Sequence, residues 1–355
     1  MVYYKHEHIL NEYRENLGKY REICDYVASF LKKKVQEKQI MTFAVEQRVK
    51  SEESLIGKLQ RKGDKYNNIS DITDICGMRV VCYFSDDVDK VAEIIKECFE
   101  IDYKNSVDKR KLLDPSSFGY LSLHFICMMT EEKGFPKEYC GVKFELQVRS
   151  ILQHAWSAID HDLSYKAKIG IPNSIVREFA RVAGLLEIAD EKFIEIRDGI
   201  TSYIKNVKKN VMDGVIDDTE IDIIYLYIFV TYNKDMQAYY KRIGEVTGAS
   251  INQMQAENYI PQLKALGVKT IKELHEMLLA NQDLAVKIAE VTIKNSGATE
   301  LPYDIGLRML CYAKLINDKY SFGQIKDFLN IGLDDEEMAN EQAEGMFMLK
   351  GKLFS

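Results

Sequence analysis

Cysteine, proline and tryptophan are scarce in this chain of 355 residues, which holds seven cysteines, five prolines and one tryptophan. No two cysteines form a C-x-x-C pair, and no histidine lies close enough to one to complete a zinc box. The cysteines are therefore predicted to be reduced, buried thiols and not metal ligands. No Pro-, Gly- or Ser-rich stretch indicates a long disordered linker.

Long apolar runs are also missing. The first residues lack the unbroken apolar segment of a secretory signal. The longest apolar run, at residues 221–232, is interrupted by Asp222 and is too short to span a bilayer. We therefore expect a cytoplasmic protein that does not bind a membrane. The net charge of −7 argues against nucleic-acid binding over the whole surface, but a local basic patch remains compatible with it.

The length and the hydrophobic patterns predict two domains. Apolar residues make up 46% of the chain, which is enough for one or two cores. The patterns predict an α+β domain over residues 1–200, with a small mixed β-sheet flanked by helices, followed by an all-α domain over residues 205–355. The expected strands are residues 77–84, 121–129 and 142–150, and the expected helices near them are residues 86–100 and 151–166.

Several further helices are predicted outside this pattern. Apolar residues spaced three and four apart from Leu10 to Leu31 predict one long helix that packs on its own domain. A partner-binding helix is the alternative. A helix from Ser174 is expected to close the first domain or to bridge to the second. Beyond it, we expect two short helices around Gly267, no convincing strand, and an acidic segment at residues 334–344 that is a solvated helix or a frayed end.

Two features near the predicted strands point to chemistry. In the strand at residues 142–150, Lys143, Glu145, Gln147 and Arg149 share one polar face, which either meets solvent or lines a cleft. Asp74 stands just before the strand at residues 77–84, where it is either a turn residue or a metal ligand. Magnesium prefers one or two carboxylates plus phosphate oxygens, so Asp74 and Glu145 form a candidate pair if their strands are neighbours.

Two further features favour nucleotide binding. Lys50, Ser54 and Lys58 step by four and are expected on one helix face, where they either bind phosphates or form an ordinary solvated surface. In the segment FGYLSLH, Tyr120 offers a flat ring for stacking on a base, and His124 lies on one face of the strand that follows.

Taken together, these segments resemble the synthetase domain of the RelA/SpoT family, the GTP pyrophosphokinases that make the (p)ppGpp alarmones of the stringent response. The resemblance covers residues 40–170, and the matching segments are RVKSEESLIGKL, DITDICGMRVV, FGYLSLH, FELQVRS and HAWSAIDHDLSYK. It implies a nucleotidyltransferase-like synthetase fold. Because only about 40 residues precede the match, we expect a single-function synthetase without the family's hydrolase domain.

The resemblance assigns roles residue by residue. Asp74 and Glu145 match the family's catalytic carboxylates, which hold Mg²⁺, and Glu145 is also proposed to activate the 3′ hydroxyl. The residues that match the ATP-binding positions are Arg48, Lys50, Ser54, Lys58 and Arg79. The residues that match the acceptor-binding positions are Tyr120, which stacks on guanine, and His124, Lys109, Gln147 and Arg149.

The acceptor loop departs from the family pattern, because Ser116 and Phe118 replace a lysine and an asparagine. Lys111 or Arg110 is a candidate to compensate. The implied activity is Mg²⁺-dependent transfer of pyrophosphate from ATP to the 3′ hydroxyl of GDP or GTP. Two alternatives stay open: a toxic relative that modifies the 3′ end of transfer RNA, and a catalytically silent nucleotide-binding regulator.

A histidine pair and the C-terminal region are two further candidates for function. His154 and His161, seven apart on one predicted helix, are considered as metal ligands, although a structural role is favoured. Residues 205–355 carry no phosphate loop, metal box or nucleophile pair, so we expect them to regulate the synthetase, to bind a partner, or to support self-association.

Overall fold

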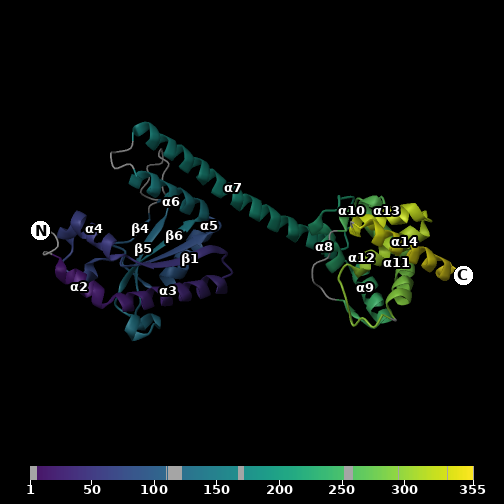
Figure 1. Ribbon diagram of the computed structural model, residues 1–355, viewed down its shortest axis with the longest axis horizontal. Coiled ribbons are helices and arrows are strands. Elements are labelled where there is room, and N and C mark those ends of the chain that lie inside the picture. The colour runs from purple at the N-terminus through teal and green to yellow at the C-terminus, as the bar shows by residue number, and fades with distance from the viewer. Residues whose placement is uncertain are drawn as a thin grey trace. The chain divides into compact units, whose positions relative to one another are not determined.

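The computed structural model describes residues 6–108, 110, 122–166, 172–251, 259–294, 296–333 and 335–354 (Figure 1). These residues form two compact units, Met1–Asp198 and Gly199–Ser355. Helix α7 (Asn173–Met212) contributes residues to both units. In the parts of the chain that are described, no helix is long and apolar enough to cross a membrane.

The first unit is built on a six-stranded mixed sheet in the order β1-β2-β6-β5-β3, with β4 also paired to β5. Strands β2 and β6 run parallel, whereas β1–β2, β5–β6, β3–β5 and β4–β5 are antiparallel. The strands are β1 (Thr42–Val49), β2 (Cys76–Cys82), β3 (Glu100–Ile101), β4 (Val107–Asp108), β5 (Leu123–Met128) and β6 (Lys143–Ser150). The expected α+β domain with a small mixed sheet is thus confirmed.

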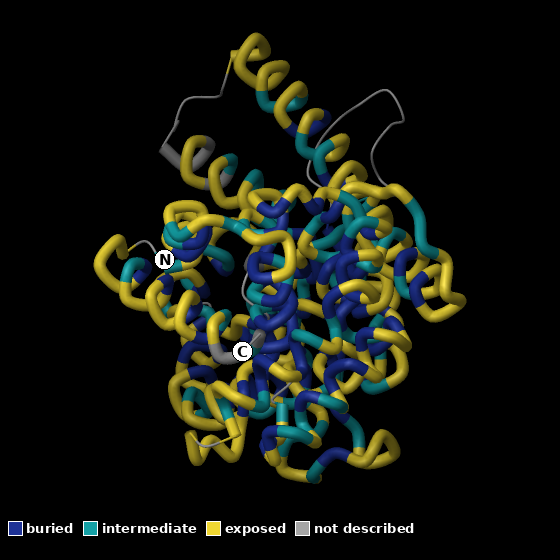
Figure 2. Tube along the Cα trace, turned by 90° about the vertical axis from the view of Figure 1, so that its right-hand side faces the viewer, coloured by how far each residue is buried: buried dark blue, intermediate teal, exposed yellow. Residues whose placement is uncertain are grey.

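One face of this sheet is apolar and carries the core. In β6, Phe144, Leu146 and Val148 are fully buried, because alternate side chains of a strand point to the same face. Helices α3 and α5 pack against this face, and the buried strand and helix positions are dark blue in Figure 2. The helices of this unit before α7 are α2 (Glu7–Glu15), α3 (Leu17–Glu37), α4 (Glu52–Lys62), α5 (Asp86–Cys98) and α6 (Ile151–Lys166). Short 3₁₀ helices lie at Gly63–Lys65, Ile69–Asp71, Glu131–Lys133 and Lys137–Tyr139.

Two local predictions for the first unit were wrong. The single N-terminal helix is two helices, α2 and α3, which meet at Asn16. The Asn16 side chain donates a hydrogen bond of 2.9 Å to the Glu12 carbonyl, and such a local bond competes with the regular helix pattern. Strand β1 was not predicted; Val45 is the one buried residue among its eight, so its sequence lacks a clear period-two pattern.

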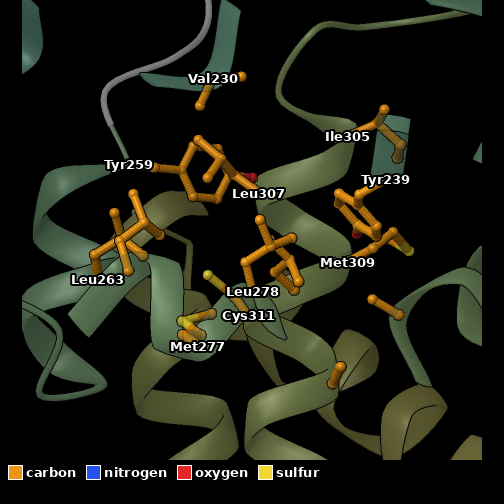
Figure 3. Close-up of a cluster of buried hydrophobic side chains, with 14 of the residues drawn as sticks. Val230, Tyr239, Tyr259, Leu263, Met277, Leu278, Ile305, Leu307, Met309 and Cys311 are labelled. Atoms are coloured by element: carbon orange, nitrogen blue, oxygen red, sulfur yellow. The ribbon is translucent and has the colours of Figure 1, made fainter. Parts of the chain in front are cut away.

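The described residues of the second unit are helical apart from one short strand pair and an isolated bridge between Glu220 and Thr270. Its helices beyond α7 are α8 (Ile223–Tyr232), α9 (Lys234–Thr247), α10 (Ile260–Ala265), α11 (Ile271–Ile293), α12 (Ile305–Asn317), α13 (Phe322–Leu333) and α14 (Glu336–Phe354). Figure 3 shows Tyr239, Leu278, Leu307 and Cys311 in its buried core.

Two expectations for this unit need correction, and a third is confirmed. Strands β7 (Ser250–Ile251) and β8 (Glu300–Leu301) pair in parallel, although no strand was predicted; two residues are too few to give a period-two pattern. The helix after Gly267 is the long α11 and not a short one. The acidic segment forms the start of α14, so its prediction as a solvated helix is confirmed: Glu336, Glu337, Glu341 and Glu344 are exposed, while Ala339 and Ala343 face the core.

Candidate active site

Gly77 lies at the centre of the polar face of the sheet. It is opposite Arg48 on β1 and opposite Glu145 on β6. A Cβ atom at Gly77 would lie 3.6 Å from Cγ of Arg48, so the Arg48 side chain crosses the space above this glycine. A cleft of about 450 Å³ opens here between β1, β2 and β6, and Arg48, Arg79, Glu145 and Gln147 contribute to its lining.

Asp74 lies just before β2 and is held by two lysines. Nζ of Lys50 is 3.1 Å from its Oδ2, and Nζ of Lys58 is 2.7 Å from its Oδ1. All three side chains are at least three-quarters buried, which strengthens such charge-assisted contacts. The predicted lysines and the predicted metal ligand therefore form one cluster.

Lys50 belongs to this cluster, but it does not lie on the helix to which it was assigned. It lies before α4, in the connection from β1, and not on the helix. Its backbone N–H donates to the Ile75 carbonyl at 2.8 Å, and its own carbonyl accepts a hydrogen bond of 2.7 Å from the hydroxyl of Tyr13. These bonds fix the Lys50 backbone beside the start of β2, where Asp74 lies.

Helix α4 supplies Lys58 and Ser54. Its first turn is capped by Ser51, whose Oγ accepts the Ser54 N–H at 3.2 Å. The hydroxyl of Ser51 also donates to Oγ of Ser54 at 2.9 Å, while the Ser54 side chain remains exposed. Nζ of Lys58 lies 5.5 Å from the centre of the Tyr66 ring, a second contact that restricts this lysine.

Glu145 is held by hydrogen bonds at both carboxylate oxygens. Nδ1 of His124 lies 3.0 Å from its Oε1, and the Gln147 amide donates to its Oε2 at 3.0 Å. Gln147 in turn accepts a hydrogen bond from Arg149. Three residues of the predicted polar face, Glu145, Gln147 and Arg149, thus form a continuous hydrogen-bond network with His124.

Burial of Glu145 acts to raise the pKa of its carboxyl. The hydrogen bond and charge of His124, the Gln147 bond and the charge of Arg48 outweigh this effect and lower the pKa to about 2. Glu145 is therefore ionised at neutral pH. A general base works best with a pKa near the operating pH, so in this arrangement Glu145 suits a cation better than a proton.

Arg79 and Arg149 lie on β2 and β6, toward the ends of these strands that α6 covers. Arg149 is only 3% exposed, because helix α6 covers this end of β2 and β6. Nη1 of Arg79 lies 3.2 Å from Oε2 of Glu46 on the neighbouring strand. Nε of Arg79 is buried and has no hydrogen-bond partner among the residues that the structure describes.

His154 on α6 joins this end of the site. Burial lowers the pKa of its imidazole, and the charges of Arg79 and Arg149 lower it further. Two cationic neighbours disfavour a metal ion at this position, which argues against the metal role considered for His154. The side chain of His161 lies outside the described residues.

Part of the predicted acceptor site also lies outside the described residues, namely Tyr120 and Lys109 together with the divergent positions Ser116 and Phe118. Ser122, the first residue described after this segment, is fully buried. His124 follows it on β5, opposite Gln147. The acceptor segment therefore leads directly into the strand beside Glu145.

The site offers two carboxylates, those of Asp74 and Glu145, as candidate magnesium ligands. Asp74 and Glu145 belong to adjacent chain segments, because β2 and β6 pair directly. Within the described ranges, no three His, Cys, Asp or Glu side chains gather as a metal site. Two carboxylates without a closed protein cage suit an ion that also binds substrate phosphates.

Comparison with known proteins places this site in a family. A family profile described as "Region found in RelA / SpoT proteins" matches residues 47–170. The chain is 33% identical over 153 residues to GTP pyrophosphokinase YwaC of Bacillus subtilis (strain 168), which covers 42% of this chain and 71% of that protein. The chain belongs to the RelA/SpoT family.

Other members of the RelA/SpoT family match the same part of the chain. GTP pyrophosphokinase YjbM of Bacillus subtilis (strain 168) is 28% identical over 153 residues, 42% of this chain and 69% of that protein. The crystal structure of small alarmone synthetase 2 from Bacillus subtilis has a TM-score of 0.45 and 28% identity, and covers 53% of this chain and 99% of that one. The assignment to the family and to the pyrophosphokinases is confirmed, so the reading as a catalytically silent regulator is not retained.

Proposed function

We propose that this RelA/SpoT protein transfers pyrophosphate from ATP to the 3′ hydroxyl of GDP or GTP, releasing AMP, in a Mg²⁺-dependent reaction. The observation that carries the proposal is the single cleft in which Arg48 and Glu145 face each other across Gly77, with the Lys50–Asp74–Lys58 cluster at the start of the same strand. The names of the relatives YwaC and YjbM, both GTP pyrophosphokinases, support the choice of a guanosine acceptor.

On the donor side, basic residues neutralise the negative charge of the ATP triphosphate. Arg48, Lys50 and Lys58 bind the ATP triphosphate, and Ser54 and Arg79 complete the donor contacts. A bound Mg²⁺ would supply positive charge to the triphosphate, and Asp74 and Glu145 are the residues that would hold it. The two lysines then exchange the Asp74 carboxylate for phosphate oxygens.

On the acceptor side, the protein positions the guanosine nucleotide for attack. Tyr120 stacks on the guanine, and Lys109 binds the acceptor phosphates. The 3′ oxygen attacks the β-phosphorus of ATP, the bond between that phosphorus and the α-β bridging oxygen breaks, and AMP leaves with that oxygen. Glu145, oriented by His124 and Gln147, accepts a hydrogen bond from the 3′ hydroxyl and helps to release its proton, which passes on to water as the new P–O bond forms. With a pKa of about 2, Glu145 is not the final proton acceptor.

An acceptor panel tests the proposal. The protein is incubated with ATP labelled in its terminal phosphates, Mg²⁺ and one acceptor at a time: GDP, GTP, ADP or transfer RNA. Label in GDP or GTP alone is the expected result. Label in transfer RNA instead would replace the guanosine nucleotide by the RNA 3′ end as the acceptor.

Replacement of Tyr120 tests the stacking role that the family match assigns to it. Tyr120→Ala is expected to raise the KM for the acceptor about 10- to 100-fold, because stacking of a base on an aromatic ring contributes about 1–3 kcal/mol. Tyr120→Phe keeps the ring and is expected to stay near the wild-type value. Steady-state kinetics at saturating ATP measure both, and equal damage in the two variants would assign the role to the hydroxyl.

For the helical unit, residues 205–355, we propose a role in regulating the synthetase, in binding a partner or in self-association. A complete core in this unit, independent of the catalytic residues, is compatible with each of these roles.

A further inference from the structure

A second cavity, of about 290 Å³, lies in the first unit away from the polar face of the sheet. Strands β2 and β6 are parallel and end together at Cys82 and Ser150, so α5 and α6 begin side by side at this edge. The cavity is enclosed by the first turns of α5 and α6 and by the part of α7 that belongs to this unit. Ligands of α/β sheets commonly bind outside the carboxyl ends of parallel strands.

The walls of the cavity are largely apolar. Val88 of α5, Trp156 of α6 and Ala183, Leu186 and Ile194 of α7 contribute to them. The Trp156 indole N–H already donates to the Phe179 carbonyl at 3.4 Å, which fixes the ring in place. Apolar walls around a few polar groups are the usual composition of a small-molecule site.

Asp190 of α7 is the buried polar group in this cavity, with 5% exposure. Its Oδ2 accepts a hydrogen bond of 2.6 Å from Oγ of Ser150. Across the described residues, no hydrogen bond or ion pair reaches its Oδ1. Burial raises the pKa of this carboxyl, and the Ser150 bond only partly opposes that effect. An ionised Asp190 therefore lacks a cation to compensate for its burial.

Charges around the cavity favour a cationic ligand. Among the described residues, its lining contains five carboxylates and one guanidinium group. The guanidinium of Arg110 is engaged by Asp89 at 2.9 Å, and Asp86 is engaged by Arg197 at 2.9 Å. Glu187 and Glu191 are exposed at the α7 side. This surplus of negative charge repels phosphates, so the cavity is unsuited to ATP or to a guanosine nucleotide.

We propose that this cavity binds a small organic cation, an amine or amidine with an apolar body. Its N–H groups donate to Oδ1 of Asp190, its apolar body packs against Leu186 and Val88, and its charge lies near the Trp156 ring. A charge-assisted hydrogen bond and a cation–π contact are the two interactions that such a ligand gains over a neutral one. The site is separate from the cleft at Gly77, and the proposal does not depend on the acceptor of the transfer reaction.

The single tryptophan of the chain makes the proposal directly measurable. Because Trp156 is the only tryptophan and lines the cavity, its fluorescence reports occupancy of this site in the full-length protein. Benzamidine is the probe, and benzamide, a neutral molecule of nearly the same shape, is its control. We expect a saturable fluorescence change with benzamidine and at least tenfold weaker binding of benzamide.

Two variants separate the site from nonspecific binding. Asp190→Asn keeps the size and an acceptor for Ser150, and is expected to weaken benzamidine binding at least tenfold. Glu195→Gln changes a carboxylate on the same helix that does not line the cavity, and is expected to bind as the wild type does. Wild-type binding should also weaken as the pH falls and Asp190 is protonated.

Several results would overturn the proposal. Equal affinity for benzamidine and benzamide would show that charge is not recognised. Unchanged binding in a folded Asp190→Asn variant, checked by circular dichroism, would remove Asp190 from the site. If that variant does not fold, Ala183→Leu fills the cavity from a buried position and must weaken binding; unchanged binding in this variant contradicts the proposal equally.

Discussion

Glu145→Gln is expected to reduce the rate of pyrophosphate transfer at least 1,000-fold while the protein stays folded. The substitution removes the negative charge that Arg48 and His124 face, and with it the charge that would hold Mg²⁺ on the triphosphate. A metal ligand contributes several kcal/mol to the transition state, and each 1.4 kcal/mol is a factor of ten in rate. Asp74→Asn is expected to act in the same direction.

A matched substitution controls for the loss of a carboxylate as such. Glu138→Gln makes the same chemical change at an exposed position outside the cleft and is expected to leave the rate unchanged. Glu145→Gln with more than a tenth of the wild-type rate would remove Glu145 from the catalytic site.

The same variant should show a characteristic pH dependence of stability. The pKa of Glu145 is lowered from an ordinary value of 4.5 to about 2, so its ionised form stabilises the folded state at neutral pH. This contribution is lost as the pH falls from about 4.5 toward 2. The difference in Tm between wild type and Glu145→Gln should therefore shrink at acid pH.

Lys58→Ala is expected to raise the KM for ATP about 10- to 100-fold with little change in the KM for the acceptor. Lys58 and Lys50 both lie at Asp74, on the donor side of the cleft, and a charge-assisted contact to phosphate contributes about 1.5–3 kcal/mol. Lys50→Ala should behave in the same way. Initial rates with each substrate varied in turn give the two KM values.

Lys62→Ala is the matched control for these lysines. Lys62 is the exposed last residue of the same helix, and among the described residues it forms no ion pair with Asp74. Its replacement should therefore leave both KM values unchanged. A selective rise in the acceptor KM for Lys58→Ala would place the lysine cluster on the wrong substrate.

The polar face of the candidate active site was largely predictable from the sequence because its signal is local. Alternation in residues 142–150 places Glu145, Gln147 and Arg149 on one face, and the structure joins them by hydrogen bonds. Strand β1, which carries Arg48 and leads into Lys50, was missed because Val45 is its one buried residue and gives no alternating pattern. The proximity of these two basic residues to Glu145 and Asp74 depends on strand pairing, which no local pattern encodes.

Contacts between distant segments account for most of what the sequence did not predict. Ser150 and Asp190 are 40 residues apart, so no spacing rule links them, and the cavity that Asp190 lines was not anticipated. The helix α7 was predicted from its apolar spacing, yet Val182, Phe193 and Ile196 are about half exposed. Periodicity identifies the helix, but only the structure shows which of its faces is covered.

Product analysis by mass spectrometry tests the central claim most directly. The full-length protein is incubated with ATP, Mg²⁺ and GDP, and the released adenosine nucleotide is measured together with the modified acceptor. Pyrophosphate transfer predicts AMP and 3′-pyrophosphorylated GDP in equal amounts, and neither in the Glu145→Gln variant. Release of ADP with a singly phosphorylated acceptor, or an equal product yield from Glu145→Gln, would contradict the account.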